Sequence, residues 1–295
     1  MASEEQTIVF MTYFISVYLG YFIVIIGVIG NIINILVFTQ LKLFRRNQSA
    51  FYLTVASIVD SFQLIFAMST RITATVIGFD LTRTSLIWCK LRVYLIRSTR
   101  IISIITICFA AIDQYLSTNS HIQLRQLSTF KLAQRLISIL IIFSFLYSIP
   151  FLLFHETRRY SVCATFHRIF NYFYSFAHYF ILVGLLPIFI SSLFSLLAYQ
   201  NVRRIIRRQM SIVRRRLDRQ LTAMILLRVA LFVITTLPYI SFRIYQINTS
   251  VNYHYTDSVG IIELINATLI TIYNIDYSVF GYCFCIDHWI SLFFL

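Results

Sequence analysis

Arg97 and Arg100 stand inside an apolar stretch of the sequence, where a guanidinium must find an anion, a polar partner or water. The stretch runs from Cys89 to Tyr115 and reads CKLRVYLIRSTRIISIITICFAAIDQY. Arg97 and Arg100 are spaced i, i+3, so in a helix they lie on one face. Because an unpaired cation is costly in lipid, we expect them to bind an anionic ligand, with Arg243 as a third contact. The alternative that stays open is pairing with an acid of the chain itself, namely Asp276, Glu263 or Asp60.

The sequence offers little for catalysis or for a metal site. Of the 5 cysteines only Cys283 and Cys285 lie close together, and no histidine pair accompanies them. We find no glycine-rich phosphate loop, zinc-protease motif or nucleophile elbow. We therefore do not expect an enzyme. The two cysteines are candidates for acylation, although buried thiols are commoner.

The composition excludes a soluble domain. In 295 residues the chain is 59% hydrophobic and 12% charged, with a mean hydropathy of +0.78, whereas a soluble domain is about 25% charged. A net charge of +14 raises the possibility of nucleic-acid binding. The basic residues alternate with long apolar runs that a nucleic-acid module would not expose, so we expect no nucleic-acid partner.

The elements that must position these side chains are seven apolar runs, each long enough to cross a bilayer as a helix of about 20 residues. We predict an all-α bundle of seven transmembrane helices in a single domain, 1–295, with a short cytoplasmic tail at 287–295. The runs show no inverted repeat of the kind that transporters have. The predicted helices are 9–39, 49–78, 86–117, 132–154, 172–200, 217–247 and 259–286.

The distribution of lysine and arginine predicts the orientation of the bundle. The turns after the first, third and fifth runs carry three, three and eight basic residues, and the other links carry about two, three and none. Basic loops stay in the cytoplasm, so we expect a multi-pass plasma-membrane protein with its N-terminus outside. The N-terminal MASEEQTIVF lacks the basic region of a signal peptide. Cys89 and Cys163 then both face the oxidising side, where we expect a disulfide rather than two free thiols.

Several motifs, spread over the whole chain, together resemble the rhodopsin-like G-protein-coupled receptors. Cys89 precedes Gln114 by 25 residues, which is the family's spacing from its disulfide cysteine to the centre of its Asp-Arg-Tyr motif. Within the family the chain is similar to peptide receptors and to orphan chemosensory-type receptors of invertebrates. The other matching pieces are GVIGN at 27–31, YLTVASIVD at 52–60, DQYLSTNSHIQLRQLSTFKLA at 113–133, Pro187, and Phe232 six residues before Pro238.

The resemblance implies a receptor that detects an extracellular ligand, a peptide or an anionic small molecule, and signals to a heterotrimeric G protein as its sixth helix moves about Pro238. Ile96 stands where amine receptors carry an aspartate, so a monoamine is not expected. Transducer coupling would fall to Asp113, Gln114, Tyr115, Arg203, Arg204 and Arg219. The activation switch would be Phe232, Thr236, Pro238 and Tyr282. A water-filled or sodium-binding pocket would be formed by Asp60, Ser103, Asn274 and Ser278, unless Arg100 reaches Asp60 and supplants the ion.

The chain also departs from the family's motifs. Gln114 replaces the arginine of Asp-Arg-Tyr, and Thr236 replaces a tryptophan. The Asn-Pro-x-x-Tyr motif reads SVFGY at 278–282. Gln114 can hydrogen-bond Asp113 but carries no charge. The alternative function is therefore a seven-span ligand-binding protein with weak or no G-protein coupling, acting as a decoy or partner receptor, and a transporter is less favoured.

Two further features concern the surfaces of the bundle. The arginine cluster at 203–219 is compatible with a helix and would dock an acidic transducer, or else hold the topology and contact anionic lipid. Asn248 begins an Asn-Thr-Ser glycosylation sequon close to the membrane.

Overall fold

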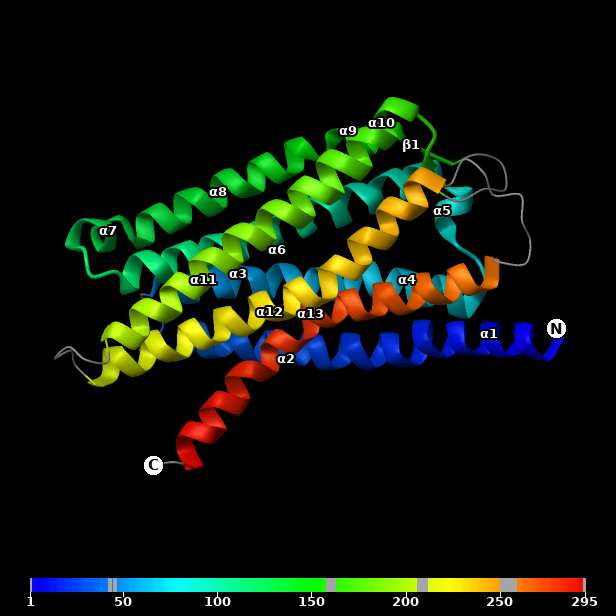
Figure 1. The fold of residues 1–295 in the computed structure, drawn as a ribbon. Helices are drawn as coiled ribbons and strands as arrows, with labels where there is room; N and C mark the ends of the chain where they lie inside the picture. Colours follow the sequence, from blue (N-terminus) through cyan, green and yellow to red (C-terminus); the bar gives the residue numbers. More distant parts are fainter. Residues whose placement is uncertain are drawn as a thin grey trace.

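The computed structural model describes residues 2–41, 44, 47–157, 163–205, 212–249 and 259–293. The described chain is almost entirely helical and forms seven long helical segments that lie side by side (Figure 1). The predicted all-α, seven-helix bundle is therefore confirmed. Several of the segments consist of two or three consecutive helices, and some contain π-helical stretches, which are labelled η.

The segments follow one another along the chain. The first is α1 (Ala2–Phe14), η1 (Ile15–Leu19) and α2 (Gly20–Gln40), and the second is α3 (Gln48–Gln63), η2 (Leu64–Met68) and α4 (Ser69–Ile77). After the short α5 (Leu81–Thr84) come α6 (Leu86–Thr118), the short α7 (Ile122–Leu127), and the fourth segment, α8 (Phe130–Tyr147) with α9 (Ile149–Phe154). The strands β1 (His155–Glu156) and β2 (Ala164–Thr165) lead to α10 (Arg168–Tyr172), η3 (Phe173–Leu185) and α11 (Leu186–Ile205). The last two segments are α12 (Ile212–Thr249) and α13 (Val259–Phe293).

The two outermost helix ends differ from those predicted. The first segment begins at Ala2 rather than at 9, and α13 continues to Phe293, through most of the predicted tail at 287–295. Apolar runs mark only the part of a helix that suits lipid, whereas residues such as Glu and Gln are good helix formers and extend it into water. The first helix therefore starts in the polar N-terminal residues.

Side-chain caps fix where three of the helices begin. The side chain of Asn47 accepts a hydrogen bond from the Ala50 N–H at 3.1 Å, at the start of α3. Ser85 does the same for α6 and Thr129 for α8, each at 3.3 Å. Because the first N–H groups of a helix have no partner within it, such oxygens stabilise the chosen start.

Six of the described segments are long and apolar enough to cross a membrane: 5–40, 48–77, 86–118, 130–154, 168–203 and 218–247. The seventh, α13, has the length but is described with side chains only in part. In lipid every backbone polar group must be satisfied within the protein, which a helix does by itself.

The third segment, α6, lies at the centre of the bundle, where it packs against α3, α8, α11 and α12. The first segment packs against the last. A Cβ atom at Gly27 of α2 would lie 2.6 Å from the Cβ and 2.8 Å from the Cα of Ser278 in α13, so only glycine permits this approach. Asn31 donates to the Tyr277 carbonyl of α13 at 3.0 Å, and Asn34 to Ser57 of α3 at 3.5 Å. These amides thus bond to neighbouring helices, as is usual within membranes.

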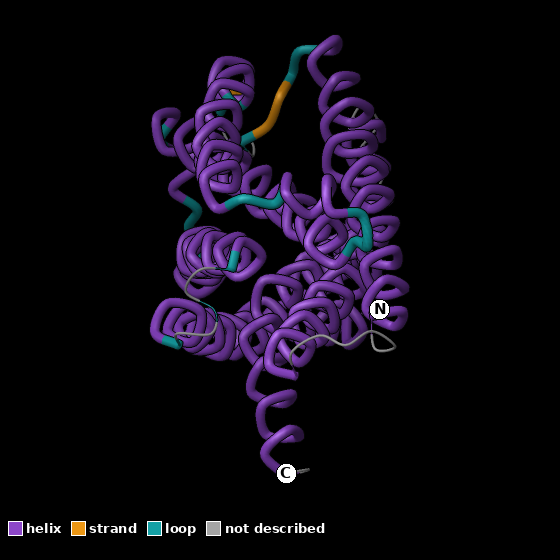
Figure 2. The backbone as a smooth tube through the Cα atoms, turned by 90° about the vertical axis from the view of Figure 1, so that its left-hand side faces the viewer, coloured by secondary structure: helices purple, strands orange, loops and turns teal. Residues whose placement is uncertain are grey.

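The bundle has two distinct ends. The N-terminus, α5, α9, α10 and the β1–β2 hairpin gather at one end, which we call the Cys89 end (Figure 1). The short α7 and the adjoining ends of α11 and α12 lie at the other, which we call the Asp113 end. The last part of α13 leaves the bundle and points away from it in both views (Figures 1 and 2).

Candidate functional site

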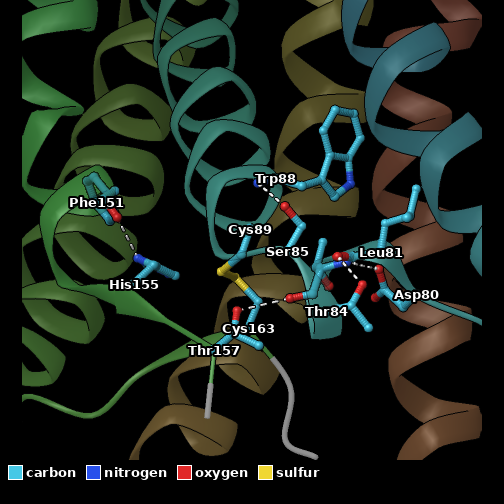
Figure 3. The surroundings of a disulfide bond; sticks show 11 residues. Asp80, Leu81, Thr84, Ser85, Trp88, Cys89, Phe151, His155, Thr157 and Cys163 are labelled. Atoms are coloured by element: carbon cyan, nitrogen blue, oxygen red, sulfur yellow. Dashed lines mark hydrogen bonds between the residues drawn. A yellow bond between two sulfur atoms is a disulfide. The ribbon is translucent and has the colours of Figure 1, made fainter. Parts of the chain in front are cut away.

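A disulfide joins α6 to the hairpin at the Cys89 end. Cys89 in the first turn of α6 is bonded to Cys163, with the two Cα atoms 5.8 Å apart (Figure 3). Close by, the Thr157 hydroxyl donates to the Thr82 carbonyl at 3.0 Å. The predicted pairing is confirmed, and it ties the hairpin to the third helix over this end of the bundle.

Arg97 lies in the bundle beneath this hairpin, and its partners are phenols. Its side chain is buried and Nη2 donates to the hydroxyl of Tyr174 on η3. The guanidinium carbon lies 5.2 Å from the ring centroids of both Tyr174 and Tyr179, within the range of a cation–π contact. The two tyrosine hydroxyls are themselves 3.2 Å apart.

Arg100, one turn deeper in α6, has a second pair of phenols. Its guanidinium carbon lies 4.3 Å from the ring centroid of Tyr273 on α13 and 5.2 Å from that of Tyr239 on α12. Nη1 donates to the Tyr239 hydroxyl at 3.4 Å. The two rings stack with centroids 4.4 Å apart. Arg100 therefore links helices six and seven to helix three and does not contact Asp60.

Arg243 on α12 completes the group. Its Nε donates to the Tyr179 hydroxyl at 3.5 Å, and Nη1 donates to Gln246 at 2.8 Å. Tyr179 thus stands between Arg243 and Arg97. The three predicted ligand-binding arginines thus lie in one group of tyrosines: Arg97 and Arg243 share Tyr179, and the ring of Tyr179 contacts that of Tyr239, a partner of Arg100.

Among the described side chains, no carboxylate forms an ion pair with any of these three guanidiniums. The ion pairs found there are those of Arg228. Of the acids considered as internal partners, Glu263 is exposed, and Asp60 and Asp276 face Arg228. Buried N–H groups of Arg97, at Nε and Nη1, and of Arg100, at Nε, have no hydrogen-bond acceptor in the described structure. Phenols disperse a positive charge but do not neutralise it, so the site keeps a strong attraction for an anion.

His155 of β1 lies at the rim of this group and is neutral at physiological pH. The side chain is buried, and its Nδ1 lies 2.9 Å from the Phe151 carbonyl (Figure 3). Burial lowers the pKa of His155 to about 4, and the positive charge of Arg97 acts in the same direction. The imidazole therefore adds no further positive charge to the site at neutral pH.

A second polar group lies deeper in the bundle, around Asp60. Arg228 of α12 donates from Nη2 to one carboxylate oxygen of Asp60 at 2.6 Å, and Ser103 of α6 donates to the other oxygen at 2.6 Å. Nε of Arg228 lies 3.8 Å from a carboxylate oxygen of Asp276 on α13. Asp60 is 0% exposed and Arg228 2%. Arg228, rather than Arg100, is thus the cation that meets Asp60.

The side chains predicted to hold a sodium ion are arranged in another way. Asn274 donates its amide N–H to the Ile270 carbonyl at 2.6 Å, and Ser278 donates to the Ile275 carbonyl at 2.9 Å, both within α13. With an arginine on Asp60 as well, these residues do not fit a sodium ion, which needs several free oxygen ligands and no neighbouring cation. Among the described side chains no cluster of histidine, cysteine, aspartate and glutamate is able to hold a metal.

At the Asp113 end, Asp113 and Gln114 of the Asp-Gln-Tyr triplet share the Ser49 hydroxyl, which lies 3.0 Å from Oε1 of Gln114, and each also has partners of its own. Asp113 accepts hydrogen bonds from Ser49 at 2.7 Å and from Ser128 at 2.6 Å. Gln114 donates to the Asp218 carbonyl at 3.1 Å and to the Thr222 hydroxyl at 2.8 Å, both on α12. The expected bond from Gln114 to Asp113 is therefore absent from the described contacts, because the amide is drawn to α12 instead.

The remaining predicted residues are placed as follows. Tyr115 packs on Phe194 of α11 with ring centroids 5.4 Å apart, and Arg203 lies over the ring of Tyr199 at 5.8 Å. Arg219 is exposed. Phe232 and Thr236 are buried on α12, six and two residues before Pro238, which lies inside the continuous helix. Among the residues named in the predictions, the side chains of Arg204, Asn248, Tyr282, Cys283 and Cys285 lie outside the described part of the structure.

Sequence reasoning missed Arg228 and the tyrosines. Arg228 stands alone in the apolar run LTAMILLRVALFVITTLP, so the rule that singled out Arg97 would have found it. The tyrosines gave no comparable signal because the chain contains 19 of them, and only the packing shows which four surround the arginines.

The comparison with protein families agrees with this architecture. The sequence pattern of the 7 transmembrane receptor (rhodopsin family) matches residues 30–274, which is most of the chain. A comparison with curated proteins found no similar sequence. The matched region includes the disulfide cysteines, the arginine–tyrosine group, the Asp113 end, and the Asp60 group except Asp276. This chain therefore belongs to the rhodopsin family of seven-transmembrane receptors.

Proposed function

We propose that the receptor detects an extracellular anionic ligand, such as a peptide carboxylate or a small anion, at Arg97, Arg100 and Arg243. The observation that supports this most is that the buried Arg97 and Arg100 and the half-buried Arg243 have phenols as partners, and no carboxylate among the described side chains. Desolvated arginines bind carboxylates strongly, because the hydrogen bonds are charge-assisted. In this proposal the Cys89 end faces the outside of the plasma membrane.

The signal then passes along α12. Arg100 donates to Tyr239 of α12, and Arg243 is itself a residue of α12. A ligand that binds these guanidiniums therefore changes the packing of the half of α12 nearer the Cys89 end. Pro238 removes a hydrogen bond inside the helix and allows it to bend. We propose that the opposite end of α12 then moves away from Gln114 and exposes the Asp113 end to a G protein. The basic residues near Arg203 and Arg219 contact the transducer or anionic lipid there.

The test measures nucleotide exchange on G proteins in membranes from cells that express the chain. The membranes are treated with a peptide library in two versions, one with free and one with amidated C-termini. Free-acid peptides should stimulate exchange, and their amides should be at least about tenfold weaker, since one charge-assisted bond to a buried cation contributes about 1.5–3 kcal/mol. Arg97→Gln should abolish the difference. Arg168→Gln, an exposed arginine at the same end, is the matched control. Equal responses to acids and amides would refute an anionic ligand.

Gln114 supports a second candidate, a receptor that binds ligand without efficient exchange. The amide that replaces the family's arginine bonds to Thr222 and the Asp218 carbonyl on α12. It carries no charge to offer a transducer. In this case wild-type membranes would bind ligand without exchange, and Gln114→Arg would restore exchange. If wild type exchanges nucleotide as efficiently as Gln114→Arg, this second candidate is excluded.

A further inference from the structure

The carboxylate of Asp60 already has a cation, and that cation is part of the chain. Arg228 Nη2 lies 2.6 Å from one oxygen of Asp60, while Ser103 donates to the other at 2.6 Å. Both ionised side chains are almost completely buried. A buried carboxylate needs a positive charge, a proton or several donors. Asp60 has the positive charge of Arg228, and it accepts hydrogen bonds from both Arg228 and Ser103.

A second carboxylate shares the same guanidinium. Asp276 is 3% exposed, and its oxygen lies 3.8 Å from Nε of Arg228. Asp60 comes from α3, Ser103 from α6, Arg228 from α12 and Asp276 from α13. Arg228 of helix six therefore holds carboxylates of helices two and seven together in the middle of the bundle, and Ser103 joins helix three to this group through its bond to Asp60.

We propose that Arg228 is a permanent, covalently attached counter-ion of Asp60 that excludes sodium from this position and holds α12 against α3 and α13 in the resting receptor. A free ion can leave when the helices rearrange. A guanidinium on α12 cannot, so outward displacement of α12 at this level must pull the charge away from Asp60. Like charges repel strongly at short range in a medium of low dielectric constant, so a sodium ion does not bind beside it.

The geometry of the neighbouring oxygens agrees with this inference. Asn274 and Ser278 lie on α13, as Asp276 does, and each donates its hydrogen bond to a carbonyl of that same helix. Within the described residues neither of them has a hydrogen bond to Asp60, whose partners are Ser103 and Arg228. The inference concerns the resting bundle alone, so it holds or fails independently of which ligand the receptor detects and of whether it couples to a G protein.

The experiment is thermal unfolding of the purified full chain in lipid nanodiscs, in about 150 mM NaCl and in equal concentrations of KCl and choline chloride. Wild type should have the same Tm in all three salts. Arg228→Gln should lose stability overall and gain a sodium-specific rise in Tm of about 2–4 °C, because the freed Asp60 can then bind the ion. The double variant Asp60→Asn/Arg228→Gln has no carboxylate to bind it and should show no such rise.

Two results would overturn the proposal. A sodium-specific rise in the Tm of wild type would show that the ion binds despite Arg228. An Arg228→Gln variant that folds but responds equally to the three salts would show that Arg228 is not what excludes the ion. If Arg228→Gln does not fold, Arg228→Lys takes its place as the test: it keeps the charge and should stay insensitive to sodium, and a sodium response in it would contradict the proposal.

Discussion

At the scale of single residues, the bundle treats buried arginines in two ways. Arg228 meets two carboxylates, whereas Arg97 and Arg100 meet the faces and hydroxyls of tyrosines. A guanidinium paired with carboxylates is electrically satisfied and serves the structure. One that is surrounded by phenols is solvated but keeps its charge. This difference is the physical reason for assigning the Asp60 group to stability and the arginine–tyrosine group to ligand binding.

His155 gives a prediction about pH. Its pKa is about 4 in the folded protein, against 6.5 for the ordinary side chain, because of burial and of the positive charges of Arg97, Arg243 and Lys90. The unfolded chain therefore binds a proton more readily, so the free energy of unfolding should fall as the pH drops from 6.5 to 4. The loss at the acid end is about 2–3 kcal/mol.

The measurement is the Tm of wild type and of His155→Gln between pH 7.5 and pH 4, in the same nanodiscs. The glutamine variant cannot take up a proton here, so its Tm should fall less steeply over this range. Other titrating groups are common to both proteins and cancel in the difference. Parallel curves would mean that His155 is not buried in its neutral form.

Individual residues also mark the limit of prediction from sequence. Arg97, Arg100 and Arg243 lie near one another in the structure, and spacing on a helix and depth in an apolar run can be read directly from a sequence; their role in ligand binding stays a prediction. Their partners could not be predicted, since these depend on how each helix is rotated about its axis. The same holds for Gln114, which was expected to bond to its neighbour Asp113 and bonds instead to Thr222 on another helix.

At the scale of elements, the apolar runs predicted where the helices lie in the sequence. Small residues and amide side chains predicted some of the contacts between helices. Gly27, Asn31 and Asn34 lie where the first helix meets the second and last. The ends of helices were less predictable. The helix α13 continues beyond the apolar run to Phe293, because a helix ends where its hydrogen-bonding or propensity fails and not where its hydropathy falls.

The contact of α2 with α13 gives a prediction at this scale. Gly27→Ala should lower the free energy of unfolding by about 1–3 kcal/mol, since the added Cβ would lie 2.8 Å from the backbone Cα of Ser278 and the helices must separate. Gly20→Ala on the same helix is the control. There the nearest atoms, at 3.1 and 3.2 Å, belong to the flexible side chain of Ile72 and can move.

Thermal unfolding of both variants in nanodiscs tests this prediction. Gly27→Ala should unfold at a clearly lower temperature than wild type, with Gly20→Ala close to wild type. Equal Tm values for the two variants would show that α2 and α13 are not as closely packed at Gly27 as the structure has them.

At the scale of the whole molecule, the chain has an unusually basic composition, with a net charge of +14. It also has buried positive charge that no acid among the described side chains balances. The seven spans and the disulfide were predictable from composition, loop charge and cysteine positions. The division of the interior into a group in which carboxylates face the arginine and an arginine–tyrosine group without a described carboxylate was not predictable, because it depends on how the helices pack together. That division is what makes the Cys89 end a binding site in this account.

The most direct test of the account measures anion binding itself, without any transducer. The purified chain in nanodiscs is heated with a panel of N-acetyl dipeptides that covers every C-terminal residue type, each as the free carboxylate and as the amide. At least one carboxylate should raise the Tm of wild type and of Arg168→Gln by about 2–4 °C, while its amide has no effect and Arg97→Gln does not respond. A panel in which no carboxylate raises the Tm, or in which acids and amides raise it equally, would contradict the claim that the buried arginines form an anion site.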